Sequence, residues 1–96
     1  MTVSQVINHI NEENYDVDIT VTDVPKGYFI AVVSIALPEG SVTREIKVDM
    51  LQLEQAPGGT MTTNSGLLTR GPGEDSIHIV VSQDGTQLAE NTQSYP

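Results

Sequence analysis

The chain contains no cysteine and no tryptophan, and it has one phenylalanine and three tyrosines among its 96 residues. Without cysteine it forms no disulfide framework, no thiolate metal site and no thiol nucleophile. The scarcity of aromatic rings argues against sugar-binding platforms and against stacking on single-stranded nucleic acid. No apolar run approaches the roughly 18 residues of a membrane span, so we expect no membrane insertion.

Basic residues are also scarce: four Lys and Arg stand against thirteen Asp and Glu, for a formal net charge of -9. A protein that binds the nucleic-acid backbone needs the opposite sign, so we expect no direct nucleic-acid binding. A negative surface attracts basic molecules, and we therefore expect a protein partner with a basic surface. The length allows one domain with one modest hydrophobic core.

The opening residues predict a short helix. Apolar side chains recur at the helical period, at Val3, Val6, Ile7 and Ile10. We expect residues 1–14 to form this amphipathic helix. It should end near Glu12 and Glu13, because the helix dipole disfavours negative charge at the C-terminal end of a helix. The segment lacks the basic region and long apolar stretch of a signal peptide, which predicts a cytosolic chain or a mature protein without its signal.

From Tyr15 onward the apolar period changes to two, which is typical of strands. Residues 16–22 alternate polar and apolar, which predicts a strand with one acidic, hydroxylated face. Residues 28–37 are apolar on both sides and predict a central strand covered on both faces. Residues 42–53 alternate again, and a change of phase at Met50 and Leu51 predicts a bulge.

Proline and glycine mark the turns between these strands, at residues 24–27, 37–40, 56–59 and 71–74. Residues 60–69 are rich in threonine and predict an edge strand interrupted at 64–66. The Asp84-Gly85 pair predicts a type I′ hairpin, and a two-residue loop there pairs Val81 with Leu88.

Together these patterns predict a mainly β fold: a small antiparallel Ig-like β-sandwich of five or six strands with a short N-terminal helix. The alternative is an α+β fold in which the helix packs on an antiparallel sheet. We expect one domain over residues 1–90 and a flexible tail over 91–96. The chain is expected to be a monomer or a weak oligomer.

We find no pattern that predicts catalysis, a cofactor or a metal site, so we expect that the chain is not an enzyme. Asn14, Asp16 and Asp18 have the spacing of the first EF-hand ligands, but Ile19 stands where glycine is needed and Pro25 where a bidentate glutamate is needed. The two histidines, His9 and His78, lack a third ligand. Neither a nucleophile elbow nor a phosphate-binding loop occurs.

The acidic residues are the candidate contacts for a partner. Five of them fall within residues 12–23, at the end of the expected helix and along the first expected strand. Two more lie on the polar side of the strand over 42–53. The candidate binding residues are Glu12, Glu13, Asp16, Asp18, Asp23, Glu45 and Asp49.

Residues 58–66, Gly-Gly-Thr-Met-Thr-Thr-Asn-Ser-Gly, followed by Gly73-Glu74, resemble the central signature of the periplasmic curli inhibitors. Asn64 stands where that family favours glutamine. Because it has no cysteine, the chain resembles the cysteine-free branch of that family. The resemblance implies a small Ig-like fold, a periplasmic location and a chaperone-like, non-enzymatic function. Such proteins restrain the assembly of amyloid curlin subunits through electrostatic contact.

Residues 1–23 resemble the opening helix and strand of a small acidic phage inhibitor of an RNA-guided CRISPR nuclease, through Ile7, Ile10, Tyr15, Val17, Thr22 and Asp23. That resemblance implies charge mimicry of nucleic acid in a host cytoplasm. A virion decoration or tail protein is a third possibility for a compact acidic β module.

Overall fold

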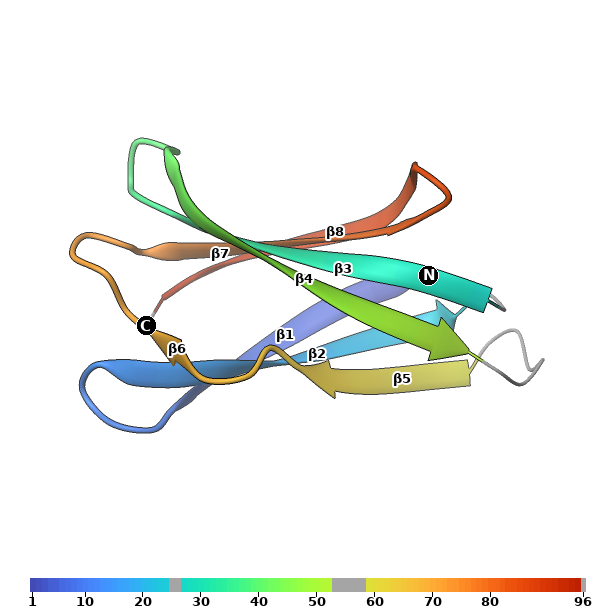
Figure 1. The fold of residues 1–96 in the computed structure, drawn as a ribbon, viewed down its shortest axis with the longest axis horizontal. Helices are drawn as coiled ribbons and strands as arrows, with labels where there is room; N and C mark the ends of the chain where they lie inside the picture. The colour runs from blue at the N-terminus through green and yellow to red at the C-terminus, as the bar shows by residue number, and fades with distance from the viewer. Residues whose placement is uncertain (25–26, 53–58, 96) are drawn as a thin grey trace.

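The computed structural model describes residues 1–24, 27–52 and 59–95, which form eight strands in two antiparallel sheets (Figure 1). Sheet A contains β1 (Thr2–His9), β2 (Asn14–Val24), β5 (Gly59–Asn64) and β6 (Leu68–Thr69). Sheet B contains, in spatial order, β4 (Val42–Gln52), β3 (Gly27–Ala36), β7 (Ser76–Gln83) and β8 (Thr86–Ser94). The mainly β prediction is confirmed, and the two sheets lie face to face as in a β-sandwich.

The core lies between the two sheets and is built by strict alternation. In β2 the inward side chains are Tyr15, Val17, Ile19 and Val21, all at most 1% exposed. They pack into one cluster with the inward side chains of β3 and β7: Phe29, Ala31, Val33, Ile35, Ile77, Ile79 and Val81. Because β-branched residues suit a pleated, half-buried surface, the sequence of these strands agrees with their position.

The prediction of an N-terminal helix is wrong, because residues 2–9 form β1. This strand pairs with β2 from Thr2 opposite Thr22 to His9 opposite Tyr15. Its inward positions include Val3 and the polar Gln5, while the apolar Val6 is 60% exposed. The inverted placement of polar and apolar residues imitates a helical period, and the backbone pairing with β2 overrides that local pattern.

Strand β3 is central, as expected, but only one of its faces is covered. It pairs with β4 on one side and with β7 on the other. Its inward side chains are buried, whereas Tyr28 is 71% exposed and Ile30 is 37% exposed on the opposite face. The prediction of cover on both faces is therefore wrong for the described chain, in which sheet B has a single sheet packed against it.

The bulge predicted at Met50 is also displaced. Pairing between β3 and β4 is regular there, with Phe29 opposite Met50, and the register shifts instead between Ile35 and Ala36. Across that shift Ile35 faces Arg44 and Ala36 faces Val42, so Thr43 is the extra residue of the bulge. Residues past the bulge keep their phase, and the inward row of β4 continues from Arg44 to Met50.

Residues 91–94, expected in the tail over 91–96, belong to a strand. Strand β8 extends to Ser94, which pairs with Ser76, and Tyr95 N donates a hydrogen bond to Asp75 O at 2.7 Å. The expected edge strand over 60–69 is confirmed as β5 and β6, both paired with β2. Between them Ser65 bonds to the backbone of Val17.

Three predicted turns have the expected geometry. Gly40 N donates to Leu37 O at 2.8 Å, and Gly73 has φ 79°, as the third residue of a type II turn requires. Asp84 and Gly85 have φ 51° and 79°, as a type I′ turn requires. The predicted register is off by one residue, because a bulge in β8 pairs Val81 with Ala89 and not with Leu88. Residues 56–58 of the turn at 56–59 and the middle of the turn at 24–27 lie outside the described residues.

We expect Gly85→Ala to lower the free energy of unfolding by about 1 kcal/mol, because alanine adopts a positive φ only at a cost. A Cβ on Gly85 would meet nothing within 4 Å, so the loss reports the backbone alone. Urea denaturation measures the change. Asp84→Asn is the control and should stay within about 0.5 kcal/mol, because asparagine tolerates the same region. An unchanged midpoint for Gly85→Ala would contradict the type I′ turn.

Candidate binding surface

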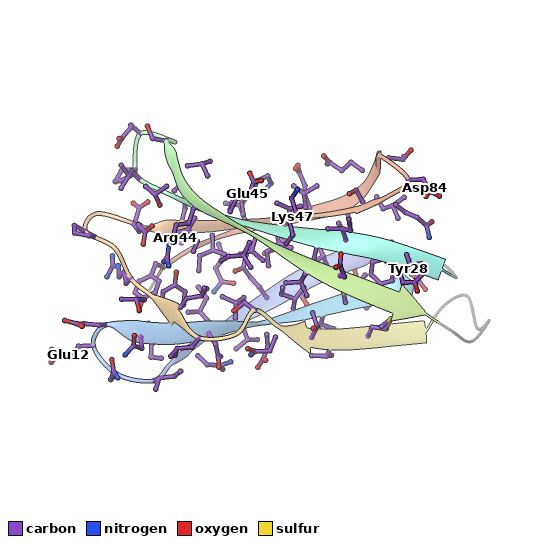
Figure 2. All side chains as sticks on the ribbon, in the orientation of Figure 1. Glu12, Tyr28, Arg44, Glu45, Lys47 and Asp84 are labelled. Atoms are coloured by element: carbon purple, nitrogen blue, oxygen red, sulfur yellow. The ribbon has the colours of Figure 1, made fainter. Side chains whose placement is uncertain are left out.

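The acidic residues of the first hairpin line one end and one face of sheet A. Glu12 and Glu13 lie in the exposed turn between β1 and β2, at the end of the molecule labelled in Figure 2. Asn11 Oδ1 accepts hydrogen bonds from Glu13 N and Asn14 N and so fixes this turn. Because Tyr15, Val17 and Ile19 point into the core, the side chains between them point to the outer face of sheet A.

Asp18 is the centre of a hydrogen-bonded group on that outer face. Asn64 Nδ2 donates to Asp18 Oδ1 at 2.8 Å, and Asn8 Nδ2 donates to Asp18 Oδ2 at 2.9 Å and to Asp16 Oδ1 at 2.8 Å. The hydrogen bonds from Asn64 and Asn8 hold the pKa of Asp18 below its usual range. Three strands, β1, β2 and β5, thus hold one ionised carboxylate in a fixed place.

The structure brings only part of the predicted set together. Glu45 and Asp49 lie on β4 of sheet B, and the inward side chains of the same strand, Ile46, Val48 and Met50, pack against the core. Glu45 therefore projects from the side of sheet B that faces away from sheet A (Figure 2). Asp23 lies in β2 at its register shift against β5, with φ 54°. Asp16 and Asp18 thus lie on the outer face of sheet A, and Glu45 and Asp49 lie on the opposite outer face, that of sheet B.

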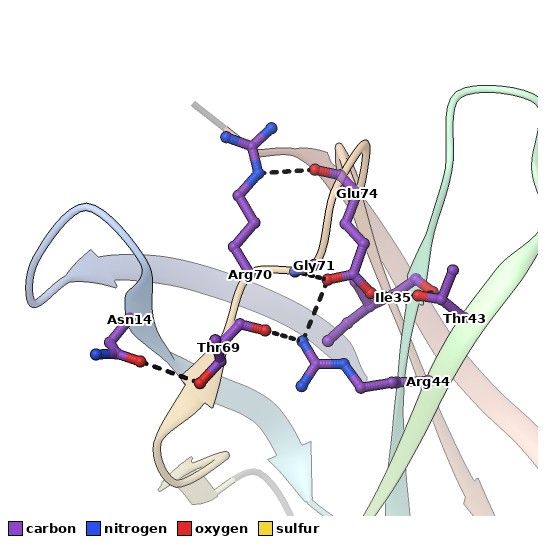
Figure 3. Close-up of polar contacts among 8 residues, drawn as sticks. All are labelled: Asn14, Ile35, Thr43, Arg44, Thr69, Arg70, Gly71 and Glu74. Atoms are coloured by element: carbon purple, nitrogen blue, oxygen red, sulfur yellow. Dashed lines mark hydrogen bonds and ion pairs between the residues drawn. The ribbon is translucent and has the colours of Figure 1, made fainter.

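Glu74 is a buried carboxylate that joins the two sheets at one end, and it is not among the contact residues predicted from the sequence. It is 4% exposed. Thr43 Oγ1 and Gly71 N donate to its two oxygens, and Arg44 Nη2 lies 3.3 Å from Oε1 (Figure 3). Arg44 also donates to Thr69 O of sheet A.

The surroundings of Glu74 explain its charge state. Burial alone raises the pKa of Glu74, but the hydrogen bonds from Thr43 and Gly71 and the Arg44 guanidinium outweigh it, so the pKa lies below its usual range. The carboxylate is fully engaged by these donors and acts as a structural cross-link. One feature of the sequence could have indicated a buried ion pair: Arg44 is a charged residue in the otherwise apolar inward row of β4. The partner lies 30 residues away, and no local pattern connects the two.

Arg70 and three rings close the same end of the molecule. The Arg70 guanidinium carbon lies 4.1 Å from the centroid of the Tyr95 ring, and Arg70 Nε donates to Glu74 O at 2.9 Å. Tyr95 contacts both Tyr15 and His9 edge to face, with centroids 5.0 and 5.1 Å apart. His9, expected on a helix, therefore belongs to this cluster, and its Nδ1 lies 3.2 Å from Tyr95 Oη.

An open groove of about 410 Å³ lies beside this cluster and is lined by Glu12, Glu13, Arg70, Gly71, Pro72 and Gly73. Two carboxylates and one guanidinium give it mixed charge, and the guanidinium is already stacked on Tyr95. Within residues 1–24, 27–52 and 59–95 there is no group of three His, Asp or Glu side chains that could hold a metal ion. The same residues contain no helix with the length and apolarity to cross a membrane.

Comparisons with known proteins give the fold alone. No family model and no curated protein matches the chain. Among solved structures, the chain is similar to one titled "Crystal structure of putative beta-galactosidase from bacteroides fragilis", with a TM-score of 0.63 and 15% sequence identity. The similarity covers 96% of this chain and 15% of that chain. The chain therefore spans only a small part of that structure's length.

We expect Glu74→Gln to lower the free energy of unfolding at pH 7 by roughly 2 kcal/mol, because it removes the charge that Arg44 faces in a buried site. The pKa of Glu74 is lower in the folded chain than its unperturbed value of 4.5. Its stabilising effect is thus present above that unperturbed value and is lost as the pH falls through the folded-state pKa. Urea denaturation at pH 7 and at pH 3 measures both.

The difference between wild type and Glu74→Gln should therefore shrink at the lower pH. Glu39→Gln is the matched control, because Glu39 is exposed in the β3–β4 turn, and it should change stability by less than about 0.5 kcal/mol. An equal loss at both pH values would show that the shape of the side chain matters and its charge does not.

Proposed function

We propose that this chain is a small acidic protein-binding module without catalytic activity, and that it acts as a chaperone-like inhibitor of amyloid (curlin) subunit assembly. One observation carries the binding proposal: the four strands of sheet A contain three aspartates, Asp16, Asp18 and Asp23, and no lysine or arginine. Glu12 and Glu13 extend this negative charge into the adjoining turn.

An uncompensated negative face of this kind attracts basic proteins over the range of a Debye length, about 8–10 Å at physiological salt. Asp18 stays ionised because its pKa is lowered by Asn64 and Asn8. The charge of Asp18 therefore persists to a lower pH than that of an aspartate without these hydrogen bonds. Such charge complementarity raises association rates and selects the partner more than it adds affinity.

The curlin proposal is supported by where the family-like segment lies. Most of it, residues 59–64, is strand β5 at the edge of sheet A. Its Asn64 donates a hydrogen bond to Asp18, so the segment and the acidic residues share one surface. We further propose that the sandwich is Ig-like, as the resemblance implies, and its two antiparallel sheets agree with that fold.

The proposal that catalysis is absent is supported by the state of the buried carboxylate. Glu74 accepts hydrogen bonds from Thr43, Gly71 and Arg44, which leaves it no role as a free acid or base. The remaining carboxylates that the structure describes are partly or fully exposed. The likeness to a putative beta-galactosidase is one of fold and brings no activity to this chain.

The alternative of a charge-mimicking phage inhibitor loses the feature on which its resemblance depended. The opening helix of that resemblance is replaced by strand β1. No observation in the described chain favours a virion protein. We therefore test the binding proposal in its most specific form, which is inhibition of amyloid assembly.

We expect sub-stoichiometric protein to lengthen the lag of curlin fibrillation, monitored by thioflavin fluorescence. The triple variant Glu12→Gln, Glu13→Gln, Asp16→Asn should bind curlin about fivefold more weakly, because two exposed charges and one half-buried charge together contribute about 1 kcal/mol. Its effect on the lag should fall accordingly, and added salt should weaken the wild type in the same direction. Asp18 is left intact because two amides depend on it.

The matched control is Glu45→Gln with Asp49→Asn, which removes charge from the opposite face. It should retain the wild-type effect on the lag. An unchanged lag with wild-type protein would exclude curlin inhibition. Loss of the effect in the control, with the triple variant still active, would move the contact from sheet A to sheet B.

A further inference from the structure

Sheet B carries an apolar strip on the face that points away from the core. The strip runs along β3 through Tyr28, Ile30 and Val32 and crosses to Val80 of β7, which lies opposite Val32. Tyr28 is 71% exposed, whereas the other three aromatic side chains, Tyr15, Phe29 and Tyr95, are buried or half-buried. Ile30 is 37% exposed, and Val32 and Val80 are half-buried. A large exposed aromatic ring beside partly exposed aliphatic groups is a common feature of protein interfaces.

The sequence of β3 is also typical of a strand whose outer face contacts another molecule. A strand exposed on one side normally alternates apolar and polar residues, but β3 places tyrosine, isoleucine and valine at its outward positions. In the described chain nothing packs on that side, so these groups remain in contact with water. A partner that covered them would gain roughly 25 cal/mol for each Å² of apolar surface removed from solvent.

Charged side chains frame the strip and indicate the chemistry of the partner. The register places Asp49 opposite Ile30, Lys47 opposite Val32 and Glu90 opposite Val80. Glu45 lies one row further along β4, opposite Ser34. His78 Nε2 lies 3.2 Å from Glu90 Oε2. Three carboxylates against one ammonium group give the rim a net negative charge.

We propose that this outer face of sheet B, centred on Tyr28, Ile30, Val32 and Val80, docks a protein partner with an apolar centre and basic side chains at its periphery. The surface is separate from the acidic face of sheet A and does not depend on curlin inhibition. A second copy of this chain is disfavoured as the occupant, because each copy has a net charge of -9 and would bring another acidic rim.

The test uses the full isotope-labelled chain and three synthetic peptides, observed by amide chemical shifts. The first peptide alternates lysine and valine, the second lysine and serine, and the third glutamate and valine. The lysine–valine peptide should bind best and should shift amides of β3, β4 and β7. Tyr28→Ser with Ile30→Ser should weaken this binding about tenfold, the loss typical of a central interface anchor. Both positions are exposed, so the variant is expected to fold.

The control is Asp16→Asn on sheet A, which should leave this binding unchanged. Equal binding of the lysine–serine peptide, or shifts confined to sheet A, would overturn the proposal, because charge alone would then explain the contact. Preference for the glutamate–valine peptide would also overturn it. Sedimentation that shows a dimer in the wild type and a monomer in the double variant would assign the face to a second copy instead. None of these outcomes depends on the thioflavin assay.

Discussion

Burial of one face of β2 against one face of β3 is the constraint on which the rest of the molecule depends. β2 is the central strand of sheet A and β3 is one of the two inner strands of sheet B, and their inward side chains, together with those of β7, form most of the core. Side chains alternate with a period of two, so a shift of one residue would expose every inward group. The outward position of Asp16 and Asp18 is therefore a consequence of burying Val17 and Ile19.

The same constraint places the groups of sheet B. With Phe29, Ala31 and Val33 in the core, Tyr28, Ile30 and Val32 must face out. On β4, Ile46 and Val48 point inward, so the charged residues that alternate with them point outward and lie beside that apolar strip. Both candidate surfaces thus follow from core packing, and the Arg44–Glu74 cross-link fixes how the sheets meet at one end.

Local sequence information was sufficient to place strands β2 and β3 and the three turns at 37–40, 71–74 and 84–85, because alternation and positive-φ residues are local signals. It failed where the decisive contact is distant in sequence. β1 is a strand because it pairs with β2 over its whole length, although its apolar residues imitate a helix. The bulge lies at Thr43, whose hydroxyl bonds to Ile35 O, and no change of hydrophobic phase marks it.

The candidate site was predicted only in part for the same reason. The alternation of polar and apolar residues predicted that Asp16, Asp18, Glu45 and Asp49 point away from the core. It could not show that the first two belong to one sheet and the last two to the other, because the choice of sheet depends on strand pairing. Glu74 joins Arg44 across 30 residues, so its burial is visible only in the folded chain.

The distribution of charge over the two faces accounts for how an exposed apolar strip can persist on such a small molecule. Tyr28 and Ile30 alone would favour association of identical chains through sheet B. Glu45, Asp49 and Glu90 surround the strip, and sheet A adds further negative charge, so two copies repel each other as they approach. For the basic partner that we propose the situation is the opposite, since the same carboxylates would attract it before the apolar groups made contact. In that proposal one set of charges both disfavours self-association and favours the partner.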